Sequence, residues 1–298
     1  MGHEDEWVLM TISQDWQMEF GSVLVGAGQS YRIKEIEGLA DYPDLRINDR
    51  SRLRRDGLLS GDDFLGGRSV VATLEVPGGT TGALAGLLGA LKAALRPGQV
   101  EAPLTLQVPG IGDGGVMRLL ARPRRFASKV DTRWRFAQPA VAIEFFATDP
   151  RIYDNDQQSL STGLATSVAG LSWNLSWNLN WGGASTGNII LANNAGTYST
   201  PWTARIDGPV TNPTIENVTT GQKLIFTADG GLVVGAGEFL TVDADARTVL
   251  LGGTASRYSK LSSLSSWWEL APGTTQLRFS GTTAGAPQLT VTFRSAWI

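Results

Sequence analysis

Hydrophobic and polar residues alternate strictly in the segment GLSWNLSWNLNWGG, residues 170–183. Leucine and tryptophan fill every odd position from Leu171 to Trp181, while serine and asparagine fill the even positions between them. A period of two is the signature of a β-strand with one apolar and one polar face. The pattern therefore predicts a strand about 36 Å long, at about 3.3 Å per residue.

The remainder of the second half is predicted to form short strands that are separated by Gly, Pro, Asn and Asp. Their ranges are 188–192, 202–207, 214–218, 223–227, 238–242, 247–251, 275–280 and 288–297. The last strand alternates cleanly and places Leu289, Val291, Phe293 and Trp297 on one face. Short strands at this spacing favour a β-sandwich.

The first half combines strands with a single helix. Strands are predicted at 18–20, 23–25, 31–36, 69–76, 105–108, 115–120 and 140–147, and Gly21-Ser22 joins the first two as a hairpin turn. The helix is predicted at about residues 82–96, because leucines at 84, 87, 88, 91 and 95 follow helical spacing and Pro97-Gly98 ends the run. The fold class is therefore all-β, with an N-terminal β-sandwich covered by one helix and a second sandwich behind it.

Charge divides the chain into two parts. Residues 1–150 hold 17 Lys and Arg with 19 Asp and Glu, whereas residues 151–298 hold 8 and 9. Seven of the ten tryptophans lie in the second part. The turn-forming Asp149-Pro150 and the polar run after it mark the boundary. We therefore predict two domains, 1–151 and 152–298.

Composition excludes several classes of site. A formal net charge of −3 gives no general attraction to nucleic acid or anionic membranes. The chain has no cysteine, and its one histidine, His3, lies in a polar terminal segment. We expect no catalytic residues, no cofactor and no metal. The first ten residues do not read as a secretory signal, and no apolar run is long enough to cross a bilayer.

Three motifs that resemble ligand-binding loops are better explained as turns. LVGAGQSY lacks the third glycine of a dinucleotide fingerprint, and PGGTTG lacks the lysine of a phosphate loop. VDADART lacks the glycine and distal glutamate of a calcium loop, which favours a hairpin turn between Val242 and Val249. A glycan-cleaving enzyme needs a carboxylate pair, and nothing singles out a pair among Glu144, Glu216, Glu238 and Glu269.

A basic cluster and several tryptophans are the candidate interaction residues. The cluster RLLARPRRFASK contains Arg118, Arg122, Arg124, Arg125 and Lys129. Acidic residues elsewhere in the first half balance this charge, which favours a solvated face or a salt-bridged subunit contact over specific nucleic-acid binding. Of the adjacent Trp267 and Trp268, one is expected in the core and the other exposed or at an interface.

The tryptophans of residues 171–181 could either stack on sugars or be buried. Trp173, Trp177 and Trp181 together present on the order of 600 Å² of ring surface, which is as large as the biggest apolar patch a typical monomer exposes. Burial is therefore favoured over a sugar platform. The sequence leaves open whether the covering surface belongs to the same chain or to a neighbour.

Several phrases resemble the distal tail protein (Dit) family of siphophages, in the form of an actinobacteriophage minor tail protein. Besides the leucine–tryptophan repeat, they are RSRLRRDGLLSGDDFLGGRSVVATLEVPG, LLARPRRF, FFATDPRIYD, DGPVTNPTIENVTTGQKLIF, SSWWELAPGTTQLRFSG and VTFRSAWI. They keep their order along nearly the whole chain. One departure is tryptophan in the repeat, where phenylalanine is more usual.

The resemblance implies a structural virion component at the distal end of a phage tail, made in the host cytoplasm. Such proteins form a hexameric ring through an N-terminal belt domain. The ring joins the tail tube protein to the tail-tip protein, and a galectin-like or carbohydrate-module-like jelly-roll domain projects from it. The alternative is a carbohydrate-binding adhesion module that recognises a host cell-wall glycan.

Overall fold

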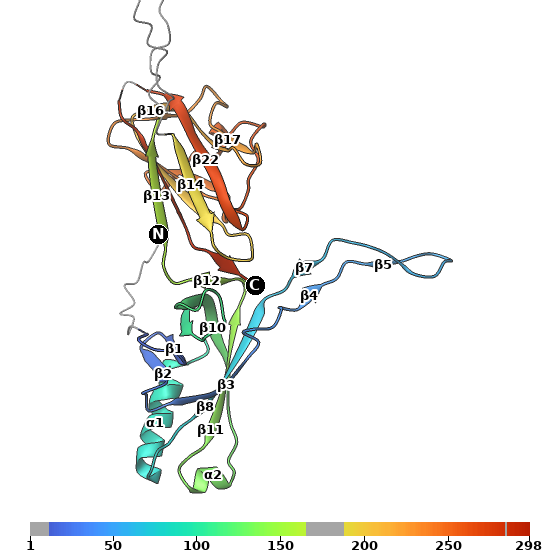
Figure 1. Cartoon of the computed structure of the whole chain (residues 1–298), viewed down its shortest axis with the longest axis vertical. Coiled ribbons are helices and arrows are strands. Elements are labelled where there is room, and N and C mark those ends of the chain that lie inside the picture. The colour runs from blue at the N-terminus through green and yellow to red at the C-terminus, as the bar shows by residue number, and fades with distance from the viewer. Residues whose placement is uncertain (1–11, 165–187, 284) are drawn as a thin grey trace, which may run out of the picture. The chain divides into compact units, whose positions relative to one another are not determined.

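The chain folds into two compact units (Figure 1). The computed structural model describes residues 12–164, 188–283 and 285–298. The first unit runs to Asn155 and also takes in Trp297 and Ile298, and the second covers Asp156–Ala296. Antiparallel strands dominate both units, so the all-β fold class is confirmed. The predicted strand at 171–181, with Trp173, Trp177 and Trp181, lies outside the described residues.

The first unit is built on one sheet of nine strands that bends at β10. Its main order is β2-β1-β9-β10-β11-β8-β3, and β12 pairs with β10. The strands are β1 Gln17–Phe20, β2 Val23–Gly26, β3 Arg32–Glu37, β8 Arg68–Glu75, β9 Ala102–Gln107, β10 Met117–Ser128, β11 Ala140–Ala147, β12 Ile152–Asp154 and β24 Ala296–Trp297, which pairs with β12. The first part of β10 pairs with β9 and the second part with β11, and the register shifts between Pro123 and Arg125. The bend brings the two halves of the sheet around one core.

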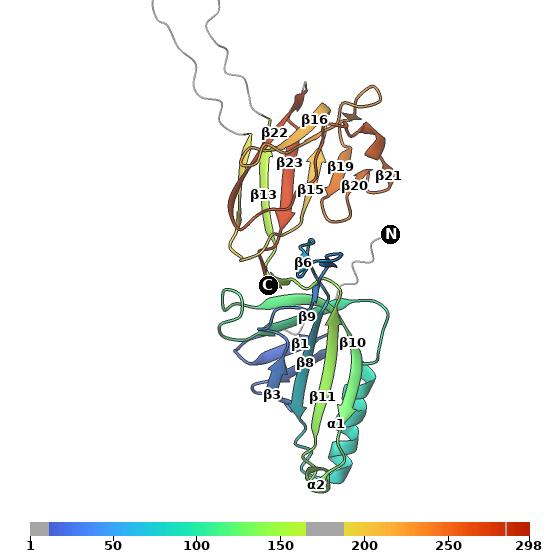
Figure 2. The same ribbon diagram turned by 90° about the vertical axis from the view of Figure 1, so that its right-hand side faces the viewer.

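Helix α1, Thr81–Ala94, covers this core, as the leucine spacing predicts (Figure 2). The hydroxyl of Thr80 accepts a hydrogen bond from the Ala83 amide and caps the first turn. Leu84, Leu88 and Leu91 are buried against the sheet. A second, one-turn helix, α2 Thr132–Arg135, precedes β11.

A narrow hairpin arm leaves the first unit between β3 and β8 (Figure 1). Its strands are β4 Leu45–Arg46, β5 Arg50–Ser51, β6 Leu58–Leu59 and β7 Phe64–Leu65. β4 pairs only with β7, and β5 only with β6. Residues 44–66 are called the arm below.

The second unit is a sandwich of two antiparallel sheets. One sheet has the order β13-β23-β15-β19-β20-β21, shown face-on in Figure 2, and the other β14-β22-β16-β17, with β18 paired to β16. The first contains β13 Gln158–Gly163, β15 Trp202–Asp207, β19 Phe239–Asp243, β20 Thr248–Leu251, β21 Ala255–Ser256 and β23 Gln288–Phe293. The second contains β14 Ile189–Asn194, β16 Val210–Asn217, β17 Lys223–Ile225, β18 Val233–Val234 and β22 Gly273–Thr282. A short 3-10 helix, Tyr258–Lys260, follows β21.

The expectation of one continuous strand at 288–297 was wrong. β23 ends at Phe293, and a separate short strand, β24 Ala296–Trp297, follows. Phe293 is buried in the core of the second unit, but Trp297 is buried in the core of the first. The alternating pattern continues across the break because both residues are buried, although they are buried in different cores.

Candidate functional site

The arm is anchored at its base by a buried arginine, Arg68, at the start of β8. Its Nη1 donates to the carbonyl oxygens of Gly38, Leu39 and Asp41 at 2.9, 3.0 and 2.7 Å, and its Nε donates to Pro150 O at 2.8 Å. Only 1% of Arg68 is exposed, and burial lowers the pKa of its guanidinium while the charge of Asp41 opposes that shift. One side chain therefore holds both the chain that leads into the arm and the chain beyond β11.

Glycines allow the backbone to close tightly at this base. Gly38 has φ +76°, and a Cβ there would lie 2.1 Å from the carbonyl oxygen of Ser69. A Cβ on Gly67 would lie 2.4 Å from the ring of Phe146. Only glycine fits such approaches, so the base of the arm is fixed by close packing as well as by Arg68.

Along its length the arm is held by its own two strands. The amide of Gly66 donates to Asp44 O at 2.6 Å, and the amide of Gly61 donates to the carboxylate of Asp49 at 3.0 Å. The guanidinium of Arg46 lies 5.6 Å from the ring centre of Phe64. These contacts join the two strands of the arm to each other.

Apolar side chains on the arm are exposed to solvent. They are Leu45, Ile47, Leu53, Leu58, Leu59 and Phe64, and Leu53 at the tip is 94% exposed. Exposed apolar side chains gathered on one protruding hairpin are typical of an interaction surface, since burying one leucine contributes about 1.5–3 kcal/mol.

The tip of the arm is also strongly basic. Arg50, Arg52, Arg54 and Arg55 lie within six residues, and Asp49 and Asp56 flank them. In the described parts of the chain, none of these four guanidinium groups has an ion-pair or hydrogen-bond partner. The tip thus combines a hydrophobic residue with unpaired positive charge.

The predicted basic cluster lies on β10 and makes several local contacts. Arg122 donates to Gln99 O at 3.0 Å, and the guanidinium of Arg124 lies 3.5 Å from the ring centre of Phe146. Arg125 is exposed and lies opposite Glu144 in the register of β10 and β11. Arg122 and Arg124 are therefore held against the sheet itself, and an interface role for the three arginines stays a prediction.

The two adjacent tryptophans differ in burial. Trp268 is only 6% exposed and packs against Trp202 with ring centres 5.1 Å apart, so it has little surface left for a ligand. Trp267 is half-buried and stacks on Tyr258 with ring centres 6.4 Å apart and an interplanar angle of 14°. Tyr258 is itself half-exposed. The surface aromatic pair is therefore Tyr258 and Trp267, a pairing that the sequence did not indicate.

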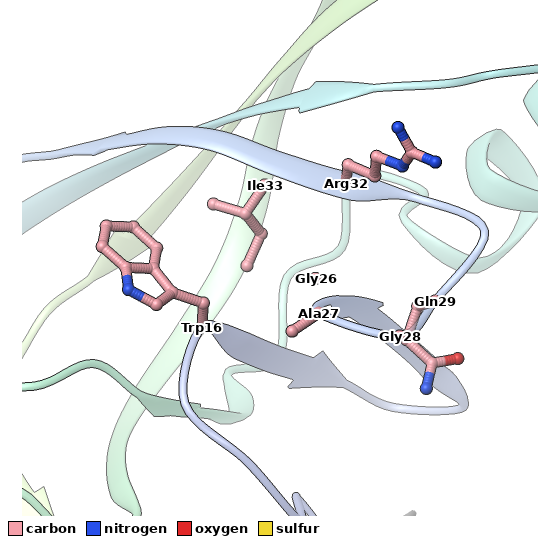
Figure 3. Close-up of a pocket in the computed structure, with 7 residues that line it drawn as sticks. All are labelled: Trp16, Gly26, Ala27, Gly28, Gln29, Arg32 and Ile33. Atoms are coloured by element: carbon pink, nitrogen blue, oxygen red, sulfur yellow. The ribbon is translucent and has the colours of Figure 1, made fainter.

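A hollow of about 490 Å³ lies beside β1, β2 and β3 of the first unit (Figure 3). It is lined by Trp16, Gly26, Ala27, Gly28, Gln29, Arg32 and Ile33. Figure 3 shows the indole of Trp16 and the guanidinium of Arg32 on opposite sides of it. The lining includes no carboxylate, histidine or hydroxyl group, so these residues provide no acid, base or nucleophile for catalysis.

Two of the four glutamates considered for glycoside hydrolysis, Glu216 and Glu238, have structural roles. Glu216 forms ion pairs with Lys223 at 3.0 Å and with Arg278 at 3.5 Å. Glu238 accepts a hydrogen bond from the amide of Gly235 and closes a turn. In the described ranges, no three acidic or histidine side chains come together as metal ligands, and no helix is long and apolar enough to span a membrane.

A comparison with known protein families finds a match in the second unit. A family profile for the C-terminal domain of siphovirus-type tail components, SPP1_Dit, matches residues 195–297. The matched residues lie almost entirely within the second unit. No curated protein sequence matches significantly. The resemblance to distal tail proteins is thereby confirmed, and the chain is a structural component of a siphovirus-type tail.

Two solved structures extend the comparison beyond the second unit. One is the crystal structure of SPP1 Dit, which is described as a paradigm of the hub adsorption apparatus in phages that infect Gram-positive bacteria. The match covers 90% of this chain and 94% of the SPP1 Dit chain. The identity is 15% and the TM-score 0.62, so both units share the fold of that protein. The other is a chain in the structure of the phage p2 baseplate in its activated conformation with Ca. The identity is 8% and the TM-score 0.46, and the match covers 89% of this chain and 91% of the baseplate chain.

In this tail component the arm was missed by sequence reasoning. Its residues were recognised only as a family phrase, although Asp56-Gly57 is a hairpin turn signal between two charged runs. The sequence signal that could have located the arm is a set of leucines among many charged residues, in a segment without the apolar run of a packed strand.

Proposed function

We propose that the protein forms the hub ring of a siphophage tail, a homo-hexamer that joins the tail tube protein to the tail-tip protein at the distal end of the virion. The observation that carries the proposal is the arm of residues 44–66. It is anchored at its base, and its apolar residues have no cover within the described chain. A second copy of the chain provides that cover.

The form of the arm is compatible with a ring. A projecting element and the surface that receives it are different parts of one chain, so the contact can repeat head-to-tail from one copy to the next. Head-to-tail contacts that repeat through a closing rotation generate rings. The hub described for SPP1 Dit, whose fold this chain shares, is consistent with such an assembly.

The experiment replaces residues 45–65 with an Asn-Gly turn and measures mass by light scattering. The full chain is expected at six times 31.8 kDa, about 190 kDa, with rings visible by electron microscopy. The arm deletion is expected as a folded monomer, because Arg68 and both cores remain. A matched control, Leu264→Ser, removes an exposed leucine of the second unit and keeps the ring. A full chain that stays monomeric at high concentration would refute the proposal.

The contacts with the tail tube and tail-tip proteins follow from the proposed hub. We expect the first unit to carry them, with Arg122, Arg124 and Arg125 as candidate interface residues on β10. Substitution of Arg125 by Glu tests this most cleanly, because its side chain is exposed, whereas Arg124, which is also exposed, stacks on Phe146. Loss of tail attachment with an intact ring is the expected outcome.

A second candidate function is glycan binding by the second unit, favoured by the stacked Tyr258 and Trp267. Aromatic rings that are partly exposed can hold the apolar faces of sugars. Titration of host-wall polysaccharides against the full chain, and against Tyr258→Ala, tests this alternative. Binding that is indifferent to Tyr258 removes this pair as the site. Trp268 is unsuited to the test because its loss would open the core.

A further inference from the structure

We infer that a groove in the first unit holds an extended, acidic peptide segment with a bulky apolar side chain, supplied by a neighbouring tail protein. The inference deepens the proposed hub, because it states what kind of segment the hub holds, and the groove shares no residue with the arm. The groove has a volume of about 490 Å³ and lies between α1, the end of β10 and α2. Its apolar lining consists of Leu95, Pro97, Phe126, Val130 and Trp134.

A β-bulge in β10 turns Phe126 toward this groove. The odd-numbered residues of β10 are buried up to Pro123, and the register with β11 shifts between Pro123 and Arg125. Beyond the shift, Phe126 lies opposite the buried Ile143 and packs against the core, whereas Arg125 lies opposite Glu144 on the other face. Figure 2 shows α1 alongside β10. The bulge therefore places an aromatic ring beside α1 where unbroken alternation would place an arginine.

The same part of β10 leaves one strand edge open. β9 pairs with β10 only as far as Ala121, which lies opposite the first residue of β9. From Arg122 to Ser128, β11 is the one strand that pairs with β10 in the described parts of the chain. An open edge presents amide and carbonyl groups, and an extended peptide can add to it as a further strand. The groove beside this edge therefore suits a peptide in extended form.

Positively charged side chains surround the apolar lining. Lys92 also lines the groove, and its ammonium lies 5.4 Å from the ring centre of Phe126. Four further cations are sequence neighbours of lining residues, and all four are exposed: Arg96, Lys129, Arg133 and Arg135. By contrast, α1, β10 and α2 contain no acidic residue. Charge complementarity therefore selects an acidic segment.

Two acidic residues lie next to these elements, and both already have partners. The Asp131 carboxylate caps α2 by accepting hydrogen bonds from the amides of Arg133 and Trp134 at 3.0 and 3.4 Å. Glu75 forms an ion pair with Arg133 at 3.9 Å. Within the ranges that the structure describes, no ion pair or hydrogen bond involves the side chains of the other three exposed cations. These three can therefore accept the carboxylates of a peptide without losing a partner.

A peptide fits the groove better than a nucleic acid does. Single-stranded nucleic acids combine phosphate contacts with stacking of bases on aromatic rings. Here Lys92 lies over the ring of Phe126, and Trp134 is half-buried against the core. An apolar side chain of a peptide can instead cover Val130, which is 80% exposed, while its carboxylates meet the surrounding cations. An apolar centre within a polar rim is the usual anatomy of a protein interface.

Fluorescence anisotropy with the full chain tests the groove, using a labelled synthetic peptide that has one phenylalanine among glutamates. Lys129→Glu with Arg135→Glu should weaken binding at least fivefold, and added salt should weaken binding to the unmodified chain. The matched control, Arg52→Glu with Arg55→Glu, changes the net charge equally on the arm and should leave the Kd unchanged. Circular dichroism checks that both variants keep the native fold. A peptide that does not bind, or that binds both variants alike, would overturn the inference.

Changes in the peptide separate docking in the groove from general attraction of a polyanion. Replacing its phenylalanine by alanine should weaken binding about tenfold, because one buried ring is lost. Methylation of alternate backbone amides should weaken binding similarly, because the peptide then cannot pair with the edge of β10. Equal binding of either modified peptide would contradict the inference, and so would equally strong competition by a short oligothymidylate.

Peptide binding does not require assembly, so the groove and the ring can fail separately. Light scattering on the same samples reports the ring. A chain that binds the peptide through Lys129 and Arg135 but stays monomeric would support the groove and refute the hub. A chain that forms the ring but does not bind the peptide would support the hub and refute the groove.

Discussion

The arm and the sandwich of the second unit are both built from antiparallel strand pairs, but they differ in whether the apolar side chains are buried. In the sandwich, the inward residues of two sheets meet each other and are almost fully buried, as Trp202 and Phe279 show. In the arm, two strand pairs stand without any sheet behind them, and Leu53 and Ile47 face solvent. The sandwich buries its apolar side chains within one unit, whereas the apolar side chains of the arm are left exposed in the described chain.

This difference separates folding stability from assembly. An isolated two-stranded hairpin is marginal in water, so pairing alone does not hold the arm in place. Its base does, through Arg68 and the closely packed Gly38. Substitutions in the sandwich should therefore affect unfolding, those at the base should affect both properties, and those at the tip should affect assembly alone.

The largest effect is expected for Trp202→Ala in the sandwich. Trp202 is 2% exposed, packs on Trp268, and donates from Nε1 to Trp268 O at 3.0 Å. Its loss should reduce the free energy of unfolding by about 3–5 kcal/mol. Urea denaturation followed by circular dichroism measures the change. Leu264→Ala, at an exposed position, is the control and should change it by less than about 0.5 kcal/mol. A loss below about 1 kcal/mol for Trp202→Ala would contradict a self-sufficient core.

Arg68→Met should be next in size, because four carbonyl oxygens lose their donor at the base of the arm. We expect a loss of about 2–4 kcal/mol in unfolding free energy, together with faster proteolysis of residues 38–67. Arg68→Lys keeps the charge but loses the planar guanidinium, so its free energy of unfolding should lie between those of the unmodified chain and Arg68→Met. Arg52→Met is the matched control on an exposed arginine and should leave stability unchanged. Equal behaviour of the two methionine variants would show that Arg68 anchors nothing.

Much of the fold could be predicted from the sequence, because burial leaves a periodic trace. The leucine spacing located α1, and alternation located β11. The turn between Val242 and Val249 was also recognised and joins β19 to β20. The same logic failed at 288–297, since periodicity records that Phe293 and Trp297 are buried but not in which core.

The candidate site was harder to predict because the residues along the arm are exposed within the single chain and its anchor, Arg68, is a buried charged residue. Arg68 reads like any charged residue at the start of a strand, and only the structure shows that it is buried and that it bonds to four carbonyl groups. Leu53 carries no periodic signal, since nothing in its own chain covers it. Trp268 was considered for a ligand role that its burial makes difficult, whereas its neighbour Trp267 pairs with Tyr258, which is nine residues away in sequence.

Gly38→Ala should have a smaller effect and separates close packing from backbone strain. Both Gly38 and Gly57 have positive φ, +76° and +93°, but only at Gly38 would the new Cβ meet a backbone oxygen. Gly57→Ala in the turn of the arm should therefore cost about 1 kcal/mol for strain alone, and Gly38→Ala about 2–3 kcal/mol. Thermal unfolding of the two variants under identical conditions gives the difference. If the costs are equal, the base of the arm is no more tightly packed than its tip.

Leu53→Ala should have the smallest effect on folding and a clear effect on assembly. The side chain is 94% exposed in the single chain, so its removal should change the free energy of unfolding of the dissociated chain by less than about 0.5 kcal/mol. If the tip is buried against a neighbouring copy, the same change removes about 1–3 kcal/mol from each contact, a fivefold or greater weakening. Sedimentation across a dilution series measures the second quantity, and urea unfolding at the lowest concentration measures the first. If the Leu53→Ala variant loses folding stability but assembles normally, Leu53 contributes to a core of its own chain and not to a contact between copies.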